Sequence, residues 1–372
     1  MPASTIPSVA DLEVGTTIDR YEVVRHVARG GMGSVWLGRF SGKHGFEKLV
    51  AIKTIRPELA QEGRFRAMFL DEARTTARLS HANIAQVLDV GEQGSMLFIV
   101  FEWVDGTSLE QLCVDSAASG EPLEVEFLLR RMMETCAGLH AAHELASSDG
   151  APLGIVHRDV SPMNVMVSKE GFAKVIDFGV AKARDRMAPE TRSGIVKGTP
   201  QYMAPEQATG QDVDRRADVW SVGSTLYRAL SGMPPFADRE ALAAFLAGRP
   251  LRPLPDTIPA PVREVVQRAL QLDPADRYAS ADAMRAALEG ALLAIRGQSV
   301  RAAIADAPSR SAATAIEGGA ALAPTQLDVP KAPRSDPRPA PTPEPPPNRA
   351  LAYGLAIAGA AAITAAFYAA CQ

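Results

Sequence analysis

The chain has 372 residues, of which 47% are apolar and 22% are charged, and its 39 Lys and Arg against 43 Asp and Glu give a net charge of −4. Such a mixture is typical of a globular protein and excludes a mostly disordered or fibrous chain. We expect no nucleic-acid partner, because binding to a phosphate backbone requires a strong basic excess, which this composition lacks.

The N-terminal segment and the cysteines indicate where the chain works. Residues 1–20 lack the continuous apolar run of a secretory signal, and we expect them to form a flexible tail. The three cysteines, Cys113, Cys136 and Cys371, lie far apart and provide neither a disulfide framework nor the spacing of a zinc site. A reducing cytoplasm fits this pattern best.

Apolar residues alternate on either side of a glycine cluster between Tyr21 and Gly38, which predicts two antiparallel strands joined by a turn. Glycines such as Gly30, Gly31 and Gly33 allow backbone N–H groups to approach phosphate oxygens. Taken alone, however, the cluster fits an ordinary hairpin turn better than a phosphate site.

The next two predicted elements are a strand and a helix, and each carries one charged residue that bears on function. Residues 49–53 form a β-rich run that ends in Lys53, and residues 65–79 have helical periodicity and carry Glu72. In isolation these two charges would be a solvated strand end and an exposed charge on a helix surface.

Several polar motifs follow between residues 155 and 278. Asp159 and Asn164 lie in a predicted loop that follows Ile155. The segments that complete the series are Lys174–Gly179, Gly198–Glu206, Asp218–Gly223 and Asp273–Tyr278. Each motif is weak evidence by itself, but their order and spacing together are specific.

In this order the motifs resemble the signature set of the protein kinases, and specifically that of the bacterial serine/threonine kinases of the eukaryotic-like (Hanks) type. The resemblance covers residues 21–293. It implies an α+β, bilobal protein-kinase fold, with a small β-rich lobe with one main helix at 21–102 and a large, mostly helical lobe at 103–293. It also implies that ATP and Mg²⁺ are used to phosphorylate Ser and Thr hydroxyls of proteins, including the chain itself.

The resemblance assigns the chemistry to a few side chains. Phosphoryl transfer leaves little covalent work to the protein, so these residues mainly position groups and neutralise charge. Lys53 would hold the α and β phosphates, and Glu72 would fix the direction of the lysine. Asn164 and Asp177 would supply the oxygen ligands that Mg²⁺ prefers. Asp159 would accept or orient the proton of the substrate hydroxyl.

A larger set of residues would contact the nucleotide. The adenine would lie between Ala51 and Met166, beside Phe101 as gatekeeper. Backbone groups of Glu102 and Val104 would pair with its edge. The full ATP-binding set is Val27, Ala28, Gly30, Gly31, Gly33, Val35, Ala51, Lys53, Glu102, Val104 and Met166. Without the resemblance, its apolar members would be ordinary core residues.

Four further residues take structural roles in the resemblance. Glu206 and Arg277 would form a buried ion pair that braces the large lobe. Asp218 would hold the catalytic loop, and His157 would brace the backbone of that loop. Because a buried charge that loses its partner is costly, removal of one member of the ion pair should cost about 3–5 kcal/mol.

The segment from Asp177 to Glu206 resembles the activation segment of related kinases. Arg158 precedes the catalytic Asp, where an arginine reads a phosphate on this segment. Thr191 and Ser193 are the best candidates for phosphorylation, because each would gain about −1.5 to −2 charge near the guanidinium. Thr199 stands at the position of the substrate-facing threonine and is expected to be structural.

The sequence departs from the family pattern at two places. Ala28 replaces the first glycine of the glycine-rich loop, which stiffens the loop slightly. Ser161 replaces the lysine that serine/threonine kinases usually carry two residues after the catalytic Asp. Loss of one such preorganised donor typically costs a factor of about 10²–10³ in rate. Lys197 is a candidate substitute for this charge.

The composition changes toward the C-terminus. Residues 294–349 form a Pro- and Ala-rich stretch, which predicts a disordered juxtamembrane linker. Residues 350–370 contain no charge and would span roughly 32 Å as a helix, enough to cross a hydrocarbon core of about 30 Å. This predicts a transmembrane helix, with an Ala-rich soluble helix as the alternative.

The flanking charges predict the orientation of this segment. Lys331, Arg334, Arg338 and Arg349 precede it, and no charge follows it. By the positive-inside rule, we expect a single-pass protein of the bacterial cytoplasmic (inner) membrane, with the kinase domain in the cytoplasm. A homodimer is plausible because related kinases are commonly activated in trans.

Two other classes of protein remain open at this point. A pseudokinase scaffold would present the fold to partners, but it has no chemical need for Lys53, Glu72, Asp159, Asn164 and Asp177 together. A metal enzyme would have to use His140 and His143, which are three residues apart on a predicted helix. We therefore interpret these two histidines as surface residues.

Overall fold

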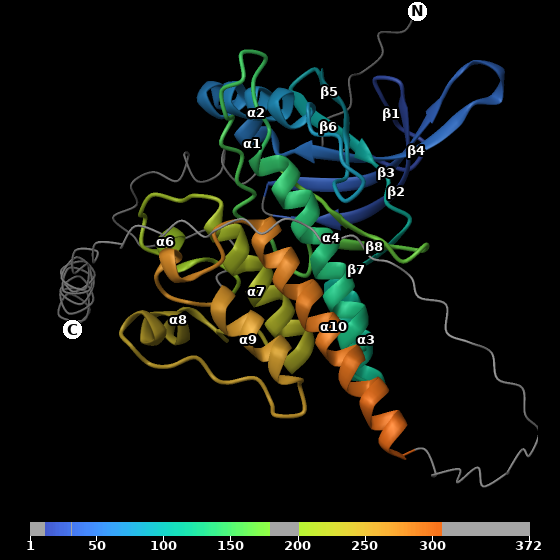
Figure 1. The fold of residues 1–372 in the computed structure, drawn as a ribbon. Coiled ribbons are helices and arrows are strands. Elements are labelled where there is room, and N and C mark those ends of the chain that lie inside the picture. The colour runs from blue at the N-terminus through green and yellow to red at the C-terminus, as the bar shows by residue number, and fades with distance from the viewer. Residues whose placement is uncertain (1–11, 31, 179–200, 307–372) are drawn as a thin grey trace, which may run out of the picture. The chain divides into compact units, whose positions relative to one another are not determined.

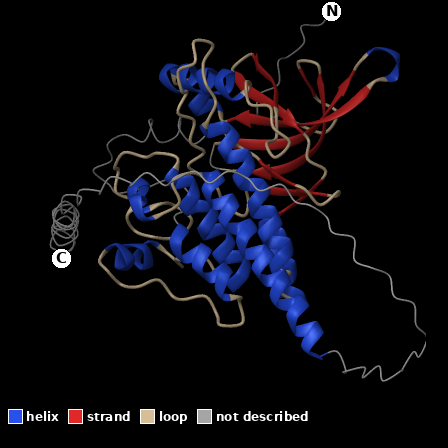
Figure 2. Cartoon of the chain, in the orientation of Figure 1, coloured by secondary structure: helices blue, strands red, loops and turns tan. Residues whose placement is uncertain are grey.

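The computed structural model of the chain describes residues 12–30, 32–178 and 201–306, and their side chains up to residue 298. The chain divides into two units, Met1–Ser299 and Val300–Gln372, and both predicted lobes lie within the first. Figure 2 shows most of the strands in the small lobe and most of the helices in the large lobe. The bilobal α+β architecture is therefore confirmed for the described residues.

The small lobe is built on an antiparallel sheet with the strand order β1-β2-β3-β4-β6-β5. Its strands are β1 (Thr17–Ile18), β2 (Tyr21–Arg29), β3 (Gly33–Ser41), β4 (Glu47–Ile55), β5 (Val87–Gln93) and β6 (Met96–Glu102). β2 and β3 pair on either side of the glycine cluster, as the alternating pattern predicts. β4 pairs with β6, and β6 buries every residue from Met96 to Phe101.

Helices α1 (Pro57–Ala60) and α2 (Gly63–Thr76) connect β4 to β5 (Figure 1). Phe65, Phe69 and Ala73 recur at a spacing of four, so they occupy one face of α2. This face is buried against the sheet, where it packs with Leu97 and Ile99. The predicted helical periodicity of residues 65–79 therefore corresponds to the main helix of the small lobe.

The prediction of a flexible tail at residues 1–20 is wrong for its second half. Leu12 and Ile18 are buried in the same cluster as Tyr21 and Val23. β1 also pairs with β2, with Thr17 opposite Glu22. A strand of two residues is too short to produce an alternating pattern, so its sequence resembles that of a tail. Residues 1–11 lie outside the described residues.

The large lobe is mostly helical, with a small antiparallel sheet of order β7-β8-β9. The sheet consists of β7 (Gly106–Ser108), β8 (Val165–Ser168) and β9 (Ala173–Val175). The helices are α3 (Leu109–Ser119), α4 (Val125–His143), α6 (Pro205–Ala208), α7 (Arg216–Ser231), α8 (Arg239–Leu246), α9 (Ala260–Ala269) and α10 (Ala281–Asp306), with a 3₁₀ turn at Pro274–Asp276. The catalytic motifs fall in the loops around this small sheet.

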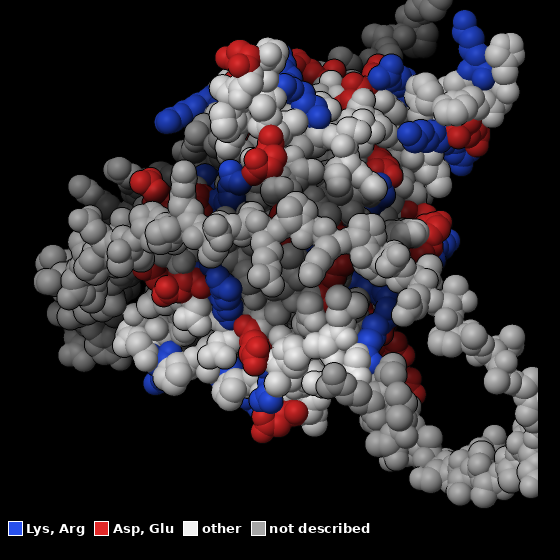
Figure 3. Space-filling model, in the orientation of Figure 1, with Lys and Arg blue, Asp and Glu red and all other residues white. Residues whose placement is uncertain are grey.

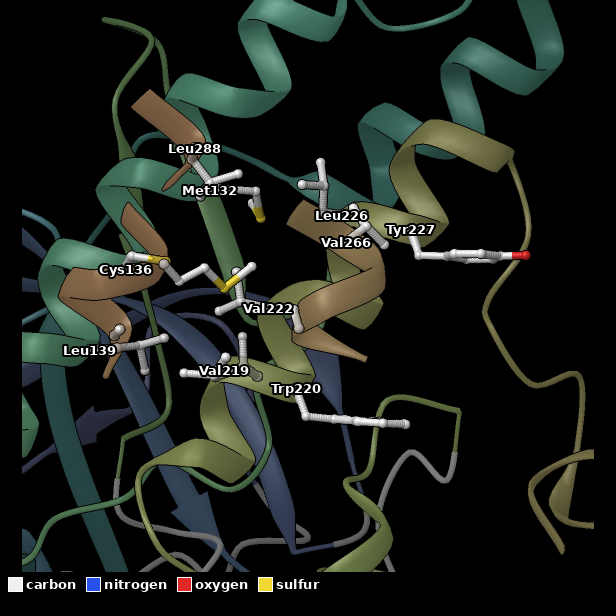
Figure 4. Close-up of a cluster of buried hydrophobic side chains, with 14 of the residues drawn as sticks. Met132, Cys136, Leu139, Val219, Trp220, Val222, Leu226, Tyr227, Val266 and Leu288 are labelled. Carbon is white, nitrogen blue, oxygen red and sulfur yellow. The ribbon is translucent and has the colours of Figure 1, made fainter. Parts of the chain in front are cut away.

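Helix α7 forms the centre of the large-lobe core, because every residue from Ala217 to Tyr227 is buried. A helix that is buried on all sides must be surrounded by other elements. Figure 4 shows Met132 and Cys136 of α4 on one side of it, with Val266 and Leu288 contributed by α9 and α10. This packing makes α7 a rigid support for any loop that is bonded to it.

Helix α10 continues to Asp306, past residue 293, where the sequence analysis places the start of the linker. Residues 294–306 are therefore helical, and the predicted boundary is wrong for them, because Ala-rich segments without Pro favour a helix. The remaining linker and the segment 350–370 lie outside the described residues. No helix among the described residues has the length and apolar character needed to cross a membrane.

Candidate active site

Lys53 and Asp177, which are separated by 124 residues in sequence, meet between the two lobes. Lys53 Nζ donates to Asp177 Oδ2 over 2.8 Å, and the two side chains are 12% and 31% exposed. Strand β4 fixes the lysine, which lies opposite Val35 on one side and Ile99 on the other. Asp177 has a backbone φ of +64°, a strained conformation for a residue with a side chain. The structure thus brings these two side chains together, as the resemblance implies.

Asp159 and Asn164 close the catalytic loop on itself. The side-chain nitrogen Nδ2 of Asn164 donates to the backbone oxygen of Asp159 over 2.7 Å. The backbone N–H of Asn164 donates to Ser161 O over 2.9 Å. The backbone oxygen of Asn164 accepts from Ile176 N over 3.0 Å. Because Ile176 immediately precedes Asp177, this bond brings the Asn164 and Asp177 segments side by side.

The donor set of Asn164 and Asp177 fits a magnesium ion. The Asn164 amide nitrogen is used in the bond to Asp159, so its oxygen is the atom left to bind a cation. Asp177 adds an anionic oxygen next to the Lys53 ammonium. Oxygen ligands of one or two side chains, completed by substrate phosphates, are typical of Mg²⁺ sites that handle nucleotides. These two residues would therefore hold Mg²⁺, which neutralises phosphate charge when bound.

The catalytic loop is anchored by the buried carboxylate of Asp218 on α7. Its Oδ2 accepts from His157 N over 2.8 Å and from His143 Nε2 over 2.7 Å. Its Oδ1 accepts from Arg158 N over 2.8 Å. Burial alone raises the pKa of Asp218, but the His143 hydrogen bond and the nearby histidines outweigh it, so that the pKa lies below its ordinary value. Asp218 therefore holds the backbone of the catalytic loop at His157 and Arg158.

His157 braces the loop through both ring nitrogens. Nδ1 accepts from Asp159 N over 3.2 Å, so Nε2 carries the proton and donates to Ile176 O over 3.0 Å. Its ring lies edge-on to Phe178 with centroids 4.6 Å apart. His157 thus connects the loop of Asp159 to the segment of Asp177.

The interpretation of His143 as a surface residue is wrong. Its side chain is 1% exposed and is bonded to Asp218. Nothing in the sequence next to His143 indicates its hydrogen-bond partner, because Asp218 lies 75 residues further along the chain. His140 is half-buried. No group of three or more His, Cys, Asp or Glu that could hold a metal ion occurs among the described residues.

The glycine-rich turn joins β2 and β3. Ala28 lies opposite Val35, and Val27 is 38% exposed. A Cβ atom on Gly33 would lie 1.7 Å from the backbone oxygen of Thr54, so Gly33 is required by the close approach of β3 to β4. Gly30 has no such neighbour, because its nearest contact would be Gly33 O at 3.9 Å. Gly31 lies outside the described residues.

The residues predicted to hold adenine occupy neighbouring strands. Ala51 of β4 lies directly opposite Phe101 of β6. Val104 is buried just after β6, and Met166 is a half-buried residue of β8. The side chain of Glu102 pairs with Lys174 at 2.9 Å, and its backbone N–H donates to Gln86 O over 2.8 Å.

Glu72 lies on α2, as predicted. Together with Phe101 and Phe178 it lines a small cavity between α2 and the sheet. Its backbone oxygen accepts the hydroxyl of Thr76. Glu72 of α2 and the ring of Phe178, which follows Asp177, therefore border the same cavity.

Glu206 and Arg277 form the predicted buried ion pair. Two parallel bonds of 2.7 and 2.8 Å join the guanidinium to the carboxylate. The remaining Arg277 donors bond to backbone oxygens of Gln271, Leu272 and Arg216. All five donors of the guanidinium are therefore used, as burial of an arginine requires.

Ser161, which replaces the usual lysine, is buried, with 2% of its surface exposed. Gln207, which no sequence motif marks, also contacts the catalytic loop: its side-chain nitrogen donates to Arg158 O over 2.9 Å.

Four residues of the predicted regulatory and substrate region lie outside the described residues: Thr191, Ser193, Lys197 and Thr199.

A family model described as the protein kinase domain matches residues 21–288, and the chain belongs to this family. Proteins of this family use ATP as substrate and Mg²⁺ as cofactor.

Relatives and solved structures agree with this assignment. The chain is 39% identical to tyrosine-protein kinase MasK of Myxococcus xanthus over 274 residues, which are 72% of this chain and 42% of MasK. It is 38% identical to serine/threonine-protein kinase PknA of Mycobacterium tuberculosis, with 74% of this chain and 63% of PknA covered. The crystal structure of the M. tuberculosis PknI kinase domain superimposes with a TM-score of 0.58 at 30% identity, over 75% of this chain and 99% of that domain. The chain thus spans less than two thirds of these two curated relatives.

Proposed function

We propose that the chain transfers the γ-phosphoryl group of ATP to Ser and Thr hydroxyls of proteins, including its own. The observation that carries this proposal is the bond of 2.8 Å between Lys53 Nζ and Asp177 Oδ2. It places a cation for the phosphates beside an anion for Mg²⁺. A chain that had lost catalysis would not need to keep both of them.

The chain's own residues explain how the transfer is favoured. Lys53 neutralises phosphate charge and Asn164 restrains the backbone of Asp159. The carboxylate of Asp159 then orients the substrate hydroxyl and takes its proton. Fixing reacting groups in this way lowers the barrier mainly through orientation and electrostatics.

The decisive experiment incubates the full chain with labelled ATP and Mg²⁺ and measures the incorporated phosphate. Lys53→Met and Asp159→Asn should each abolish incorporation. Lys169→Met is the matched control, because Lys169 is 72% exposed and pairs with Asp105 away from these residues. A wild-type chain that binds ATP without transferring phosphate would favour the pseudokinase, as would equal labelling of all variants.

A tyrosine acceptor is the second candidate. It is favoured by the similarity to MasK, which is named a tyrosine-protein kinase. Ser161 also occupies the position where serine/threonine kinases usually have lysine. Phosphoamino-acid analysis of the labelled product decides between the two, because only phosphotyrosine would overturn the Ser/Thr assignment.

Three further parts of the proposal remain, and the first two concern regions outside the described residues. Autophosphorylation of Thr191 or Ser193 should raise activity, which mass spectrometry of active protein would test.

The uncharged segment 350–370 should anchor the chain in the bacterial inner membrane with the kinase domain in the cytoplasm. Deletion of this segment should move the protein from the membrane fraction to the supernatant.

The third part is activation in trans within a homodimer. It predicts that the rate of autophosphorylation per molecule rises with protein concentration.

A further inference from the structure

We propose that Gln207 is a positioning residue for phosphoryl transfer, which fixes the peptide bond that precedes Asp159. This inference rests on the proposed function, because it assigns Gln207 to the same reaction. Gln207 lies on α6, which follows the activation segment, whereas Asp159 lies in the catalytic loop. The side chain therefore connects two segments that must be aligned for transfer.

The amide of Gln207 is held at both ends. Its Nε2 donates to the backbone oxygen of Arg158 over 2.9 Å, and its Oε1 accepts from Ala204 N over 3.2 Å. Only one orientation of the amide satisfies both bonds, because the nitrogen can only donate and the oxygen can only accept. Gln207 is thus a directional bridge rather than a space-filling side chain.

The peptide bond between Arg158 and Asp159 is gripped on both of its polar atoms. Its carbonyl oxygen accepts from Gln207, and its N–H donates to His157 Nδ1 over 3.2 Å. Arg158 has a φ of +67°, a strained conformation that persists only when its surroundings enforce it. Rotation of this peptide plane would break both bonds and turn the Asp159 side chain away. Gln207 supplies the restraint on the carbonyl side.

Helix α6 has anchors besides this amide, which contributes to the helix only the cap on Ala204 N. Glu206, the preceding residue, is bound to Arg277 by two short bonds. Thr209 Oγ1 also donates to the backbone oxygen of Pro205 over 2.9 Å. A loss of activity without a loss of structure is therefore the expected result when Gln207 is replaced.

The test uses Gln207→Met and Gln207→Glu in the full chain. The Met variant keeps the length of the side chain without hydrogen bonds. The Glu variant keeps the acceptor for Ala204 but presents a carboxylate oxygen to the Arg158 carbonyl. Both should lower kcat by about 10- to 100-fold, the scale of a small misplacement of a reacting group, with KM for ATP within about twofold of the wild-type value. Gln211→Met, at an exposed glutamine nearby, should leave both parameters unchanged.

A second measurement is independent of activity. Hydrogen–deuterium exchange of the peptide containing residues 155–164 should be faster in both Gln207 variants than in wild type and Gln211→Met, at matched thermal stability. Unchanged exchange and unchanged kcat would overturn the inference. Unchanged exchange with lower stability would assign Gln207 a merely structural role and would also overturn it. If the wild-type chain transfers no phosphate, the proposed function fails, and exchange alone decides whether Gln207 restrains this loop.

Discussion

The ring of His143 donates a hydrogen bond of 2.7 Å to the carboxylate of Asp218, and both side chains are buried. Asp218 uses its two oxygens to hold the amides of His157 and Arg158 as well. A histidine of α4 therefore supports the carboxylate that supports the catalytic loop. This arrangement ties the loop to α4 and α7, which supply much of the large-lobe core drawn in Figure 4.

Replacement of His143 by Phe should lower the free energy of unfolding by about 1.5–3 kcal/mol, because it removes a hydrogen bond to a charged group while filling most of the ring volume. Denaturant unfolding monitored by fluorescence measures the change. His140→Phe, one turn earlier on α4, is the matched control and should cost less. Equal losses for the two variants would show that the Asp218 contact contributes nothing.

Stability should fall in acid partly through Asp218. Its pKa lies below the ordinary carboxyl value of 3.8 because the hydrogen bonds to the ionised form outweigh its burial. A lowered folded pKa means that the contribution to stability is complete above about 4 and is lost as the pH falls through the lower folded value. Asp218→Asn, which cannot ionise, should therefore lose less stability between neutral pH and acid than wild type. Identical acid slopes in urea titrations would contradict this.

The sequence motifs predicted most of the site because each chemical role requires one residue type at a fixed local spacing. Lys53 in a strand and Asp159 with Asn164 in one loop are such cases, although β4 continues past Lys53 to Ile55. The structure brings Lys53 to Asp177 and Asn164 to Asp159. His143 and Gln207 escaped prediction for the opposite reason. Each acts through a bond to a segment 75 or 49 residues away, and nothing in its own neighbourhood marks it.

The boundaries of the fold were predicted less well, for a related reason. Ile18 belongs to a strand of two residues, which is defined by pairing with β2 and not by a periodic pattern. The C-terminal part of α10 lies beyond the last family motif, so only its alanine-rich composition favoured a helix. Charges give little help with boundaries, since acidic and basic side chains are interspersed over the face drawn in Figure 3.

Glu206→Leu should destabilise the large lobe by about 3–5 kcal/mol, because it leaves the guanidinium of Arg277 buried without its anion. The double variant Glu206→Leu with Arg277→Met should lose less than the sum of the two single losses, since removing both charges leaves neither unpaired. Urea unfolding of the four proteins gives the coupling free energy. Strict additivity would mean that the pair is not coupled.

Alanine substitutions at Gly30 and Gly33 of the glycine-rich turn should have different effects on folding. Gly33→Ala should impair folding, because its Cβ would meet the backbone oxygen of Thr54 at 1.7 Å and that oxygen belongs to the paired strand β4. Overpacking of this kind costs about 1–3 kcal/mol or more. Gly30→Ala should fold normally, because the nearest atom to its Cβ would be Gly33 O at 3.9 Å.

The two variants also separate structure from ATP binding. If the backbone of Gly30 approaches the phosphates, the added methyl group should raise KM for ATP while the midpoint of thermal unfolding stays at the wild-type value. Gly33→Ala should lower that midpoint even without nucleotide. Calorimetry and ATP titrations of both variants provide the comparison. Equal unfolding midpoints for the two would refute the close approach at Gly33, and an unchanged KM in Gly30→Ala would place the phosphates away from this turn.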